Sequence, residues 1–134
     1  MDLLLDTHIL LWMINGDDRM PAKAKDLILD LNNTIYFSSI SIMEIAIKHK
    51  KNPDIMPLTG DFVYRTLLEN GIYTMPLKAK HISALENLKI KDNAIVNGDP
   101  FDRALIAQAK YERMKLVTTD SAMEYYDEDC LLLV

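Results

Sequence analysis

Short apolar segments alternate with longer segments of helical periodicity along the whole chain. The short apolar or β-branched segments, which are typical of strands, are Leu3–Leu5, Thr34–Ser38, Ile72–Met75, Lys115–Thr118 and Cys130–Leu133. These segments are continuously apolar rather than alternating, which indicates a sheet buried on both faces. The regular alternation of strand and helix predicts an α/β fold, a three-layer α/β/α sandwich with a mainly parallel sheet of about five strands.

The predicted helices have recognisable ends. They cover residues 7–14, 24–31, 41–50, 61–70, 78–88 and 101–112. Asn15-Gly16 and Asn52-Pro53 are typical of helix termini. In the 78–88 segment, Ile82 and Leu85 are expected to face the core. No repeat, linker or change of composition divides the chain, so residues 1–134 are expected to form a single domain.

Composition limits the class of protein. The 134 residues are 49% hydrophobic and 26% charged, as in an ordinary globular domain. No apolar run approaches the roughly 20 residues that span a bilayer, so no membrane association is expected. The lone cysteine, Cys130, cannot form an internal disulfide, and a reducing cytoplasm is the expected compartment. The net charge of −5 argues against a nucleic-acid scaffold, but less against an enzyme that meets nucleic acid transiently.

Four acidic residues stand where an apolar segment gives way to a helix start. They are Asp6, Glu44, Asp102 and Asp120. Because the carboxyl ends of parallel strands meet at one edge of a sheet, these side chains are expected to lie together. Four carboxylates so close repel one another unless a cation neutralises them. Oxygen ligands without nearby His or Cys suit Mg²⁺ or Mn²⁺ rather than zinc, and this points to phosphate chemistry.

Helix capping is the alternative explanation for each acid. The capping candidates are Asp6 or Thr7, a Ser41–Glu44 capping box, Asp99 before Pro100 and a Ser121–Glu124 capping box. For any single acid, capping is the simpler explanation. Capping does not explain why the immediate turns at all four sites lack a cation apart from Arg103. The group as a whole therefore favours a metal site.

Other chemistries fit the sequence less well. The three histidines are not spaced as a zinc site, and the four glycines are isolated, so no glycine-rich phosphate loop is present. The basic stretch Lys48–Lys51 reads either as a solvated helix end or as a guide for a phosphate backbone. The eight methionines either fill the core or line a groove for an amphipathic partner helix.

Four blocks of the chain resemble the motifs of PIN-domain ribonucleases. They are Asp6–Trp12, Ser38–Lys48, Asp99–Ala109 and Leu116–Asp120, and they occur in the order of that family. The block Asp99-Pro100-Phe101-Asp102 is the most distinctive of the four. Together the blocks span nearly the whole chain. The subgroup that the chain resembles is the VapC-type toxins of toxin–antitoxin pairs, in particular those paired with Phd/YefM-like antitoxins.

This resemblance implies a metal-dependent endoribonuclease. The implied metal-binding and catalytic residues are Asp6, Glu44, Asp102 and Asp120, with Asp99 nearby. Asp6 and Asp102 would hold Mg²⁺ or Mn²⁺, and Ser38 and Thr118 would position waters or carboxylates. The expected partners are an RNA substrate, a cognate antitoxin protein and a second copy of the chain in a homodimer.

The chain departs from the subgroup at two places. Asn97-Gly98, within a predicted polar loop over Asn93–Asp99, replaces a His-Arg pair that is common there, so Arg103 or Lys48 would have to contact RNA or the partner instead. Met43 stands where Trp is common. Two alternatives stay open at this point. One is a PIN-like binding module without catalysis, and the other is a Mg²⁺-binding receiver domain, which would need a lysine at the end of its last strand.

Overall fold

The computed structural model describes residues 1–91 and 99–134 and contains a five-stranded sheet in the order β3-β2-β1-β4-β5. The strands are β1 (Asp2–Leu5), β2 (Thr34–Ser38), β3 (Tyr73–Met75), β4 (Lys115–Thr118) and β5 (Leu131–Leu133). Every neighbouring pair in this sheet is parallel. β1 is the central strand and pairs with β2 on one side and β4 on the other. The predicted parallel sheet is confirmed.

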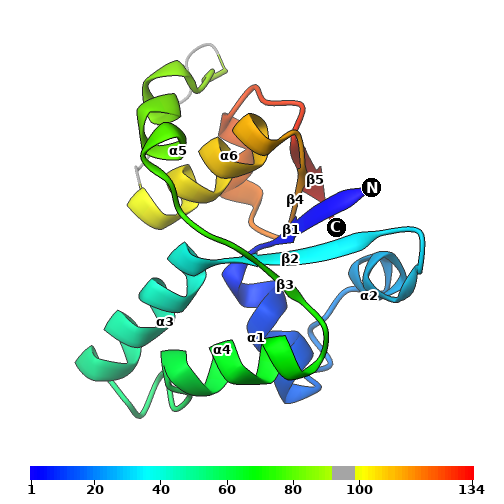
Figure 1. Cartoon of the computed structure of the whole chain (residues 1–134), viewed down its shortest axis with the longest axis vertical. Coiled ribbons are helices and arrows are strands. Elements are labelled where there is room, and N and C mark those ends of the chain that lie inside the picture. Colours follow the sequence, from blue (N-terminus) through cyan, green and yellow to red (C-terminus); the bar gives the residue numbers. More distant parts are fainter. Residues whose placement is uncertain (92–98) are drawn as a thin grey trace.

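Helices cover both faces of the sheet (Figure 1). They are α1 (Thr7–Asn15), α2 (Ala22–Leu29), α3 (Ser39–Lys51), α4 (Gly60–Glu69), α5 (Ala79–Ser83) and α6 (Pro100–Glu112), with short 3-10 helices η1 (Ala84–Asn87) and η2 (Ser121–Tyr125). Leu3 and Leu5 of β1 pack with α1, α2 and α4, whereas Leu4 packs with α6. The expected three-layer sandwich is therefore confirmed.

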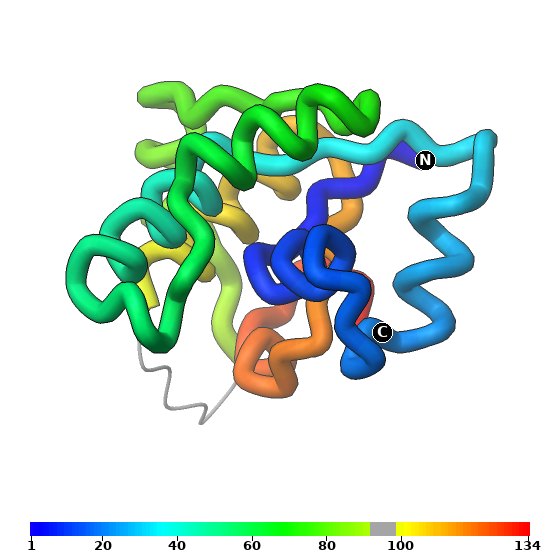
Figure 2. Tube along the Cα trace, turned by 90° about the horizontal axis from the view of Figure 1, so that it is seen from below, coloured from blue at the N-terminus to red at the C-terminus, as the bar shows by residue number. Residues whose placement is uncertain are grey.

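The central strand explains the layering. Leu3, Leu4 and Leu5 are all 0% exposed, because successive side chains of a strand point to opposite faces and both faces are covered. Figure 2 shows α2 and α3 at opposite ends of β2, which connects them in the chain. α3 starts directly at the carboxyl end of β2, and this brings its first turns to the edge where β1 also ends.

Two glycines allow the end of α1 and the close packing of α4 on α3. Gly16 ends α1 with a φ of 60°, a left-handed conformation that glycine adopts without the steric cost of a side chain. Gly60 starts α4 close to α3, where an added Cβ would lie 3.0 Å from the carbonyl oxygen of Ile42 and 3.1 Å from the Cβ of Ala46. The close contact of α3 and α4 therefore depends on the missing side chain at Gly60.

The predicted continuous helix over 78–88 is wrong. The segment forms the short α5 and then η1, with Ile82 44% exposed and Leu85 only partly buried. His81 is instead the residue that is fully buried. Its ring accepts a hydrogen bond from the Lys78 amide and contacts Glu112 of α6, and these two bonds turn its side of the helix inward.

Some expectations cannot be compared with the structure. The turn at Gly98, most of the predicted polar loop and the Asn97-Gly98 departure lie outside the described residues. Among residues 1–91 and 99–134, no helix combines the length and the apolar character needed to cross a membrane.

Candidate functional site

Asp6 lies at the carboxyl end of the central strand and begins α1 as its N-cap. It is 4% exposed. One carboxylate oxygen accepts a hydrogen bond from the Thr7 amide at 2.7 Å, and the other accepts one from the Thr118 hydroxyl at 2.6 Å. Burial raises the pKa of Asp6 more than these two hydrogen bonds lower it. The central acid is thus held in a fixed position at a site that resists its negative charge.

Glu44 reaches the same edge from α3, and it is not part of a capping box. α3 begins at Ser39 with Ser38 as its N-cap, so Ser41 and Glu44 lie inside the helix. Both are buried, and Thr7 Oγ1 lies 2.9 Å from Ser41 Oγ and 2.9 Å from Glu44 Oε1. A hydroxyl has one proton, so with Glu44 ionised Thr7 donates to Glu44 and accepts from Ser41. This relay connects α1 to α3.

Asp120 follows β4 and caps η2. Its Oδ1 accepts a hydrogen bond from the Ala122 amide at 2.9 Å, so the predicted capping box with Ser121 as the cap is wrong. The Asp120 amide donates to Thr118 Oγ1 at 3.1 Å, and Thr118 in turn donates to Asp6. The hydroxyl of Thr118 thereby links the turn that carries Asp120 to the central acid.

Asp99 and Asp102 belong to the start of α6. Asp99 is the N-cap, with its Oδ1 2.8 Å from the Phe101 amide, and Pro100 takes the first helical position as predicted. Asp102 is in the first turn and half-buried. Burial, together with the charges of Asp99, Asp6, Asp120 and Glu44, raises the pKa of Asp102 to about 7.

The fold brings these acids toward one edge of the sheet. Asp6 follows β1, Asp120 follows β4, and Glu44 is joined by a hydrogen bond to Thr7, the residue after Asp6. After burial, the charges of the neighbouring acids add to the raised pKa of Asp102. In the described part of the chain, no three acidic, histidine or cysteine side chains stand close enough in their present positions to hold a metal ion. Two of the acids face other partners, because Asp6 bonds to Thr118 and Glu44 bonds to Thr7 and Lys48.

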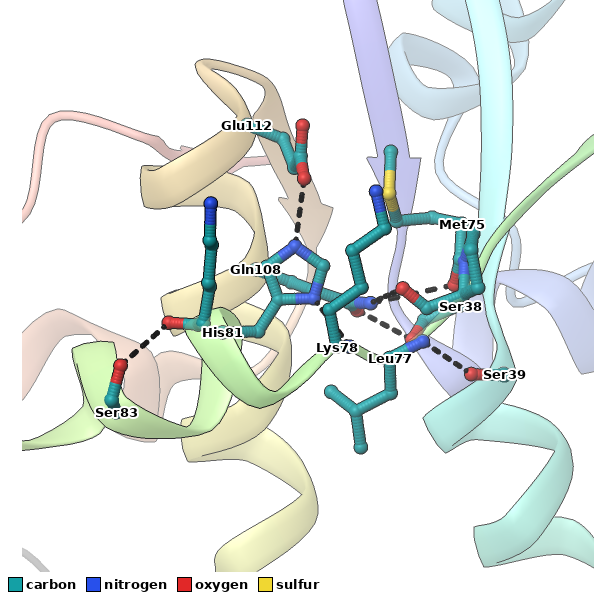
Figure 3. Close-up of polar contacts among 11 residues, drawn as sticks. Ser38, Ser39, Met75, Leu77, Lys78, His81, Ser83, Gln108 and Glu112 are labelled. Atoms are coloured by element: carbon teal, nitrogen blue, oxygen red, sulfur yellow. Dashed lines mark hydrogen bonds and ion pairs between the residues drawn. The ribbon is translucent and has the colours of Figure 1, made fainter.

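Two further residues proposed from the sequence, Ser38 and Arg103, have other surroundings than the acids. Ser38 is fully buried and donates a 2.5 Å hydrogen bond to Oε1 of Gln108, whose amide group faces the carbonyl oxygens of Met75 and Pro76 (Figure 3). Ser38 therefore caps α3 and ties it to α6, with no bond to a site carboxylate. Arg103 is exposed on α6.

Sequence reasoning missed Thr7 and Lys48, which contact Glu44, and Ser41, which contacts Thr7. Thr7 and Ser41 were considered only as caps, and their contact spans 34 positions of sequence, which no local pattern reveals. Lys48 was considered for RNA, but its Nζ lies 2.5 Å from Glu44 Oε2. Glu44 and Lys48 are four residues apart, which places them on one face of a helix. This spacing could have predicted their contact from the sequence.

A scan of protein-family models identifies the family. The PIN domain model matches residues 3–129, so the chain belongs to the PIN domain family. The resemblance stated from the sequence is confirmed, and it excludes the receiver-domain alternative. No match to the chain is found among curated proteins.

Solved structures share the fold. VapBC2 from Rickettsia felis, bound to a DNA fragment from its promoter, has a TM-score of 0.70 at 22% identity, covering 100% of this chain and 98% of that one. A toxin–antitoxin complex from Klebsiella pneumoniae has a TM-score of 0.60 at 17% identity, covering 97% and 95%. VapBC-1 from nontypeable Haemophilus influenzae has a TM-score of 0.55 at 16% identity, covering 90% and 87%.

Proposed function

We propose that the chain is a metal-dependent endoribonuclease and the toxin of a toxin–antitoxin pair. The observation that carries this proposal is the set of acids at the carboxyl edge of the sheet in a chain of the PIN family. There Thr118 joins Asp6 at the end of β1 to the Asp120 turn after β4, and Thr7 joins α1 to Glu44. The three similar structures, which are VapBC or toxin–antitoxin complexes, support the toxin role. A PIN-like binding module without catalysis is the competing function, and the lack of three preformed ligands among the described residues favours it.

The chemistry of the donor set fits Mg²⁺ or Mn²⁺. All the candidate ligands are carboxylates, the hard oxygen donors that these ions prefer. Asp6 and Asp102 would hold the ion, and Glu44 and Asp120 would complete or orient its ligands. Burial, and after it the charges of the neighbouring acids, raise the pKa of Asp102, and a bound cation would favour its ionised form. A bound ion would stabilise charge on the scissile phosphate and lower the pKa of an attacking water.

The protein's own groups keep this site in position. The Thr118 hydroxyl donates a hydrogen bond to Asp6 and accepts one from the Asp120 amide. These two bonds hold the carboxyl ends of β1 and β4 together. Thr7 performs the same task between α1 and Glu44. Carboxylates held in this way would keep a bound cation in a fixed position, and such a cation would supply the positive charge that holds a phosphodiester for in-line attack.

An apolar groove supports an antitoxin partner. A cavity of about 400 Å³ lies between α1 and α2 and is lined by Trp12, Met13, Met20, Ile28 and Leu29, with Asp17 and Asp18 also among its lining residues. A second cavity of about 420 Å³ shares Met13, Ile28 and Leu29 and extends to α4. We propose that the apolar face of an amphipathic antitoxin helix binds here, since most of the lining is apolar. The charged part of the lining is mixed, because Lys25 also lines the groove and Asp17 is paired with Arg19. A basic side chain of the antitoxin would enter the carboxylate site.

The homodimer and the cytoplasmic location remain part of the proposal. Met43 and Ile47 lie one turn apart on α3 and are 47% and 49% exposed, which supports a contact with a second copy. Burial and the charge of Glu128 raise the pKa of the Cys130 thiol to about 11, so this thiol is protonated at neutral pH. The proposed cytoplasmic location rests on the lone cysteine, which cannot form a disulfide within the chain.

The experiment that tests the function is cleavage of RNA by the purified chain. We expect cleavage with added Mn²⁺, loss of cleavage after chelation by EDTA and recovery when Mn²⁺ is restored. An antitoxin-free preparation that leaves RNA intact under all three conditions would support the binding module instead.

A further inference from the structure

The carboxylate of Glu44 already has a cation of its own. Lys48 Nζ lies 2.5 Å from Glu44 Oε2, and the other oxygen, Oε1, accepts the hydrogen bond from Thr7. The Glu44 side chain is 8% exposed, whereas that of Lys48 is 47% exposed. Both oxygens of this candidate metal ligand are thus engaged within the protein.

Lys48 is also connected through Glu44 to a second acid of the site. Thr7, which donates to the other oxygen of Glu44, directly follows Asp6 and gives its amide hydrogen to the Asp6 carboxylate. Lys48 is therefore a cation bonded to one acid of the site and linked through Thr7 to a second.

The pair differs from an ordinary surface ion pair on a helix. Arg65 and Asp61 of α4 have the same four-residue spacing, and their side chains are 65% and 71% exposed. That pair sits in water, where such contacts contribute little. The buried carboxylate of Glu44, by contrast, needs a charge partner because few waters reach it.

We propose that Lys48 is an internal counter-ion that holds Glu44 while no metal is bound, and that a divalent cation must displace it from Glu44 in order to bind. This inference rests on the proposed metal-dependent function. A divalent cation at Glu44 would repel the ammonium, since like charges at short range oppose each other. Lys48 can withdraw because its side chain is 47% exposed and its four-carbon stem is flexible.

The test measures the melting temperature of the full chain without metal and across a series of Mn²⁺ concentrations. Three proteins are compared: wild type, Lys48→Met and the control Lys50→Met. The control removes the same charge from an exposed position of the same helix.

We expect Lys48→Met to melt below wild type without metal, because Glu44 loses its partner. We also expect a given Mn²⁺-dependent rise in its melting temperature at about three- to tenfold lower Mn²⁺ concentration, because no hydrogen-bonded cation has to be displaced. Lys50→Met should follow wild type in both measurements.

The inference is overturned if Lys48→Met responds to Mn²⁺ at the same or a higher concentration than Lys50→Met. If wild type itself shows no response to Mn²⁺, the proposed metal site fails together with the inference. Lys48→Gln, which keeps a polar side chain of similar length, provides the same comparison should Lys48→Met not fold.

Discussion

At the scale of single residues, Asp102 shows how the carboxylate site affects stability. Its pKa is about 7 in the folded chain, because of burial and the charges of Asp99, Asp6, Asp120 and Glu44, against 3.8 for an ordinary aspartate. Between pH 4 and pH 7 the metal-free folded state therefore holds a proton that the unfolded state has lost. Stability falls as pH rises through this window, since the folded state binds more protons. Burial also raises the pKa of Asp6, so Asp6 likewise lowers the stability of the metal-free fold as pH rises.

Replacing Asp102 with asparagine should remove much of this pH dependence. We expect Asp102→Asn without metal to be more stable than wild type at pH 8 by about 1–2 kcal/mol, allowing for solvent screening of a half-buried group. At pH 4 the two proteins should be nearly equal. Urea unfolding at both pH values, with Asp18→Asn as an exposed control, measures the difference. A stability gap for Asp102→Asn that is the same at pH 4 and pH 8 would contradict the assigned electrostatics.

How far the sequence predicts the candidate site depends on how local each contact is. Asp6 directly follows β1 and Asp120 lies two positions after the end of β4, so the pattern alone brings them to one edge of the sheet. The partner of Glu44 could not be foreseen in the same way, since Thr7 lies 37 positions away and meets it only after α1 and α3 pack. The predicted capping boxes at Ser41 and Ser121 are wrong because Ser38 and Asp120 are the N-caps, so both helices begin earlier than predicted. The roles of these acids in binding metal stay predictions.

At the scale of elements, α6 carries Asp99 and Asp102 and is held by polar contacts at its buried side (Figure 3). His81 of α5 is 0% exposed, and its Nε2 lies 2.8 Å from Glu112 Oε1. Its Nδ1 accepts from the Lys78 amide, so the neutral ring carries its proton on Nε2 and donates to Glu112. Gln108 adds a bond to Ser38 at the end of β2.

Removing the acceptor at Glu112 should destabilise the chain. Glu112→Ala leaves the buried Nε2–H of His81 unpaired, and we expect a loss of about 1–3 kcal/mol in the free energy of unfolding. Glu112→Gln keeps an acceptor oxygen at the same reach, and a loss below about 1 kcal/mol is expected. Chemical denaturation of both variants at pH 7.5 gives the comparison. Equal losses for the two variants would show that the hydrogen bond to His81 is not what anchors α5 to α6.

At the scale of the whole molecule, the element order was predictable because each strand is a local apolar run between polar turns. β1 was foreseen at Leu3–Leu5 and is found at Asp2–Leu5, and its burial on both faces follows from its apolar sequence. The 78–88 segment was not predictable, because its inward residue is a histidine whose partner, Glu112, lies 31 positions away. Apolar periodicity cannot identify a core position occupied by a polar residue that finds its partner only on folding.

The toxin role predicts an effect on a living cell. Expression of the wild-type chain alone in bacteria should stop growth, because an unrestrained ribonuclease destroys cellular RNA, and Asp6→Asn should allow growth. Co-expression of the native neighbouring antitoxin should restore growth to the wild-type strain. Growth curves at matched protein levels provide the measurement. Normal growth with a wild-type chain that cleaves RNA when purified would contradict the toxin role while leaving the nuclease intact.

The most direct measurement of the central claim is RNA cleavage by Asp6→Asn beside wild type and Asp18→Asn, at saturating Mn²⁺. Asp6 lies buried at the end of the central strand, among the gathered acids, whereas Asp18 is an exposed acid on the loop after α1. If the carboxylates at this edge form the catalytic metal site, Asp18→Asn cleaves RNA like wild type and Asp6→Asn, although folded, is reduced by at least about a thousandfold. Cleavage by folded Asp6→Asn at the wild-type rate would contradict the account.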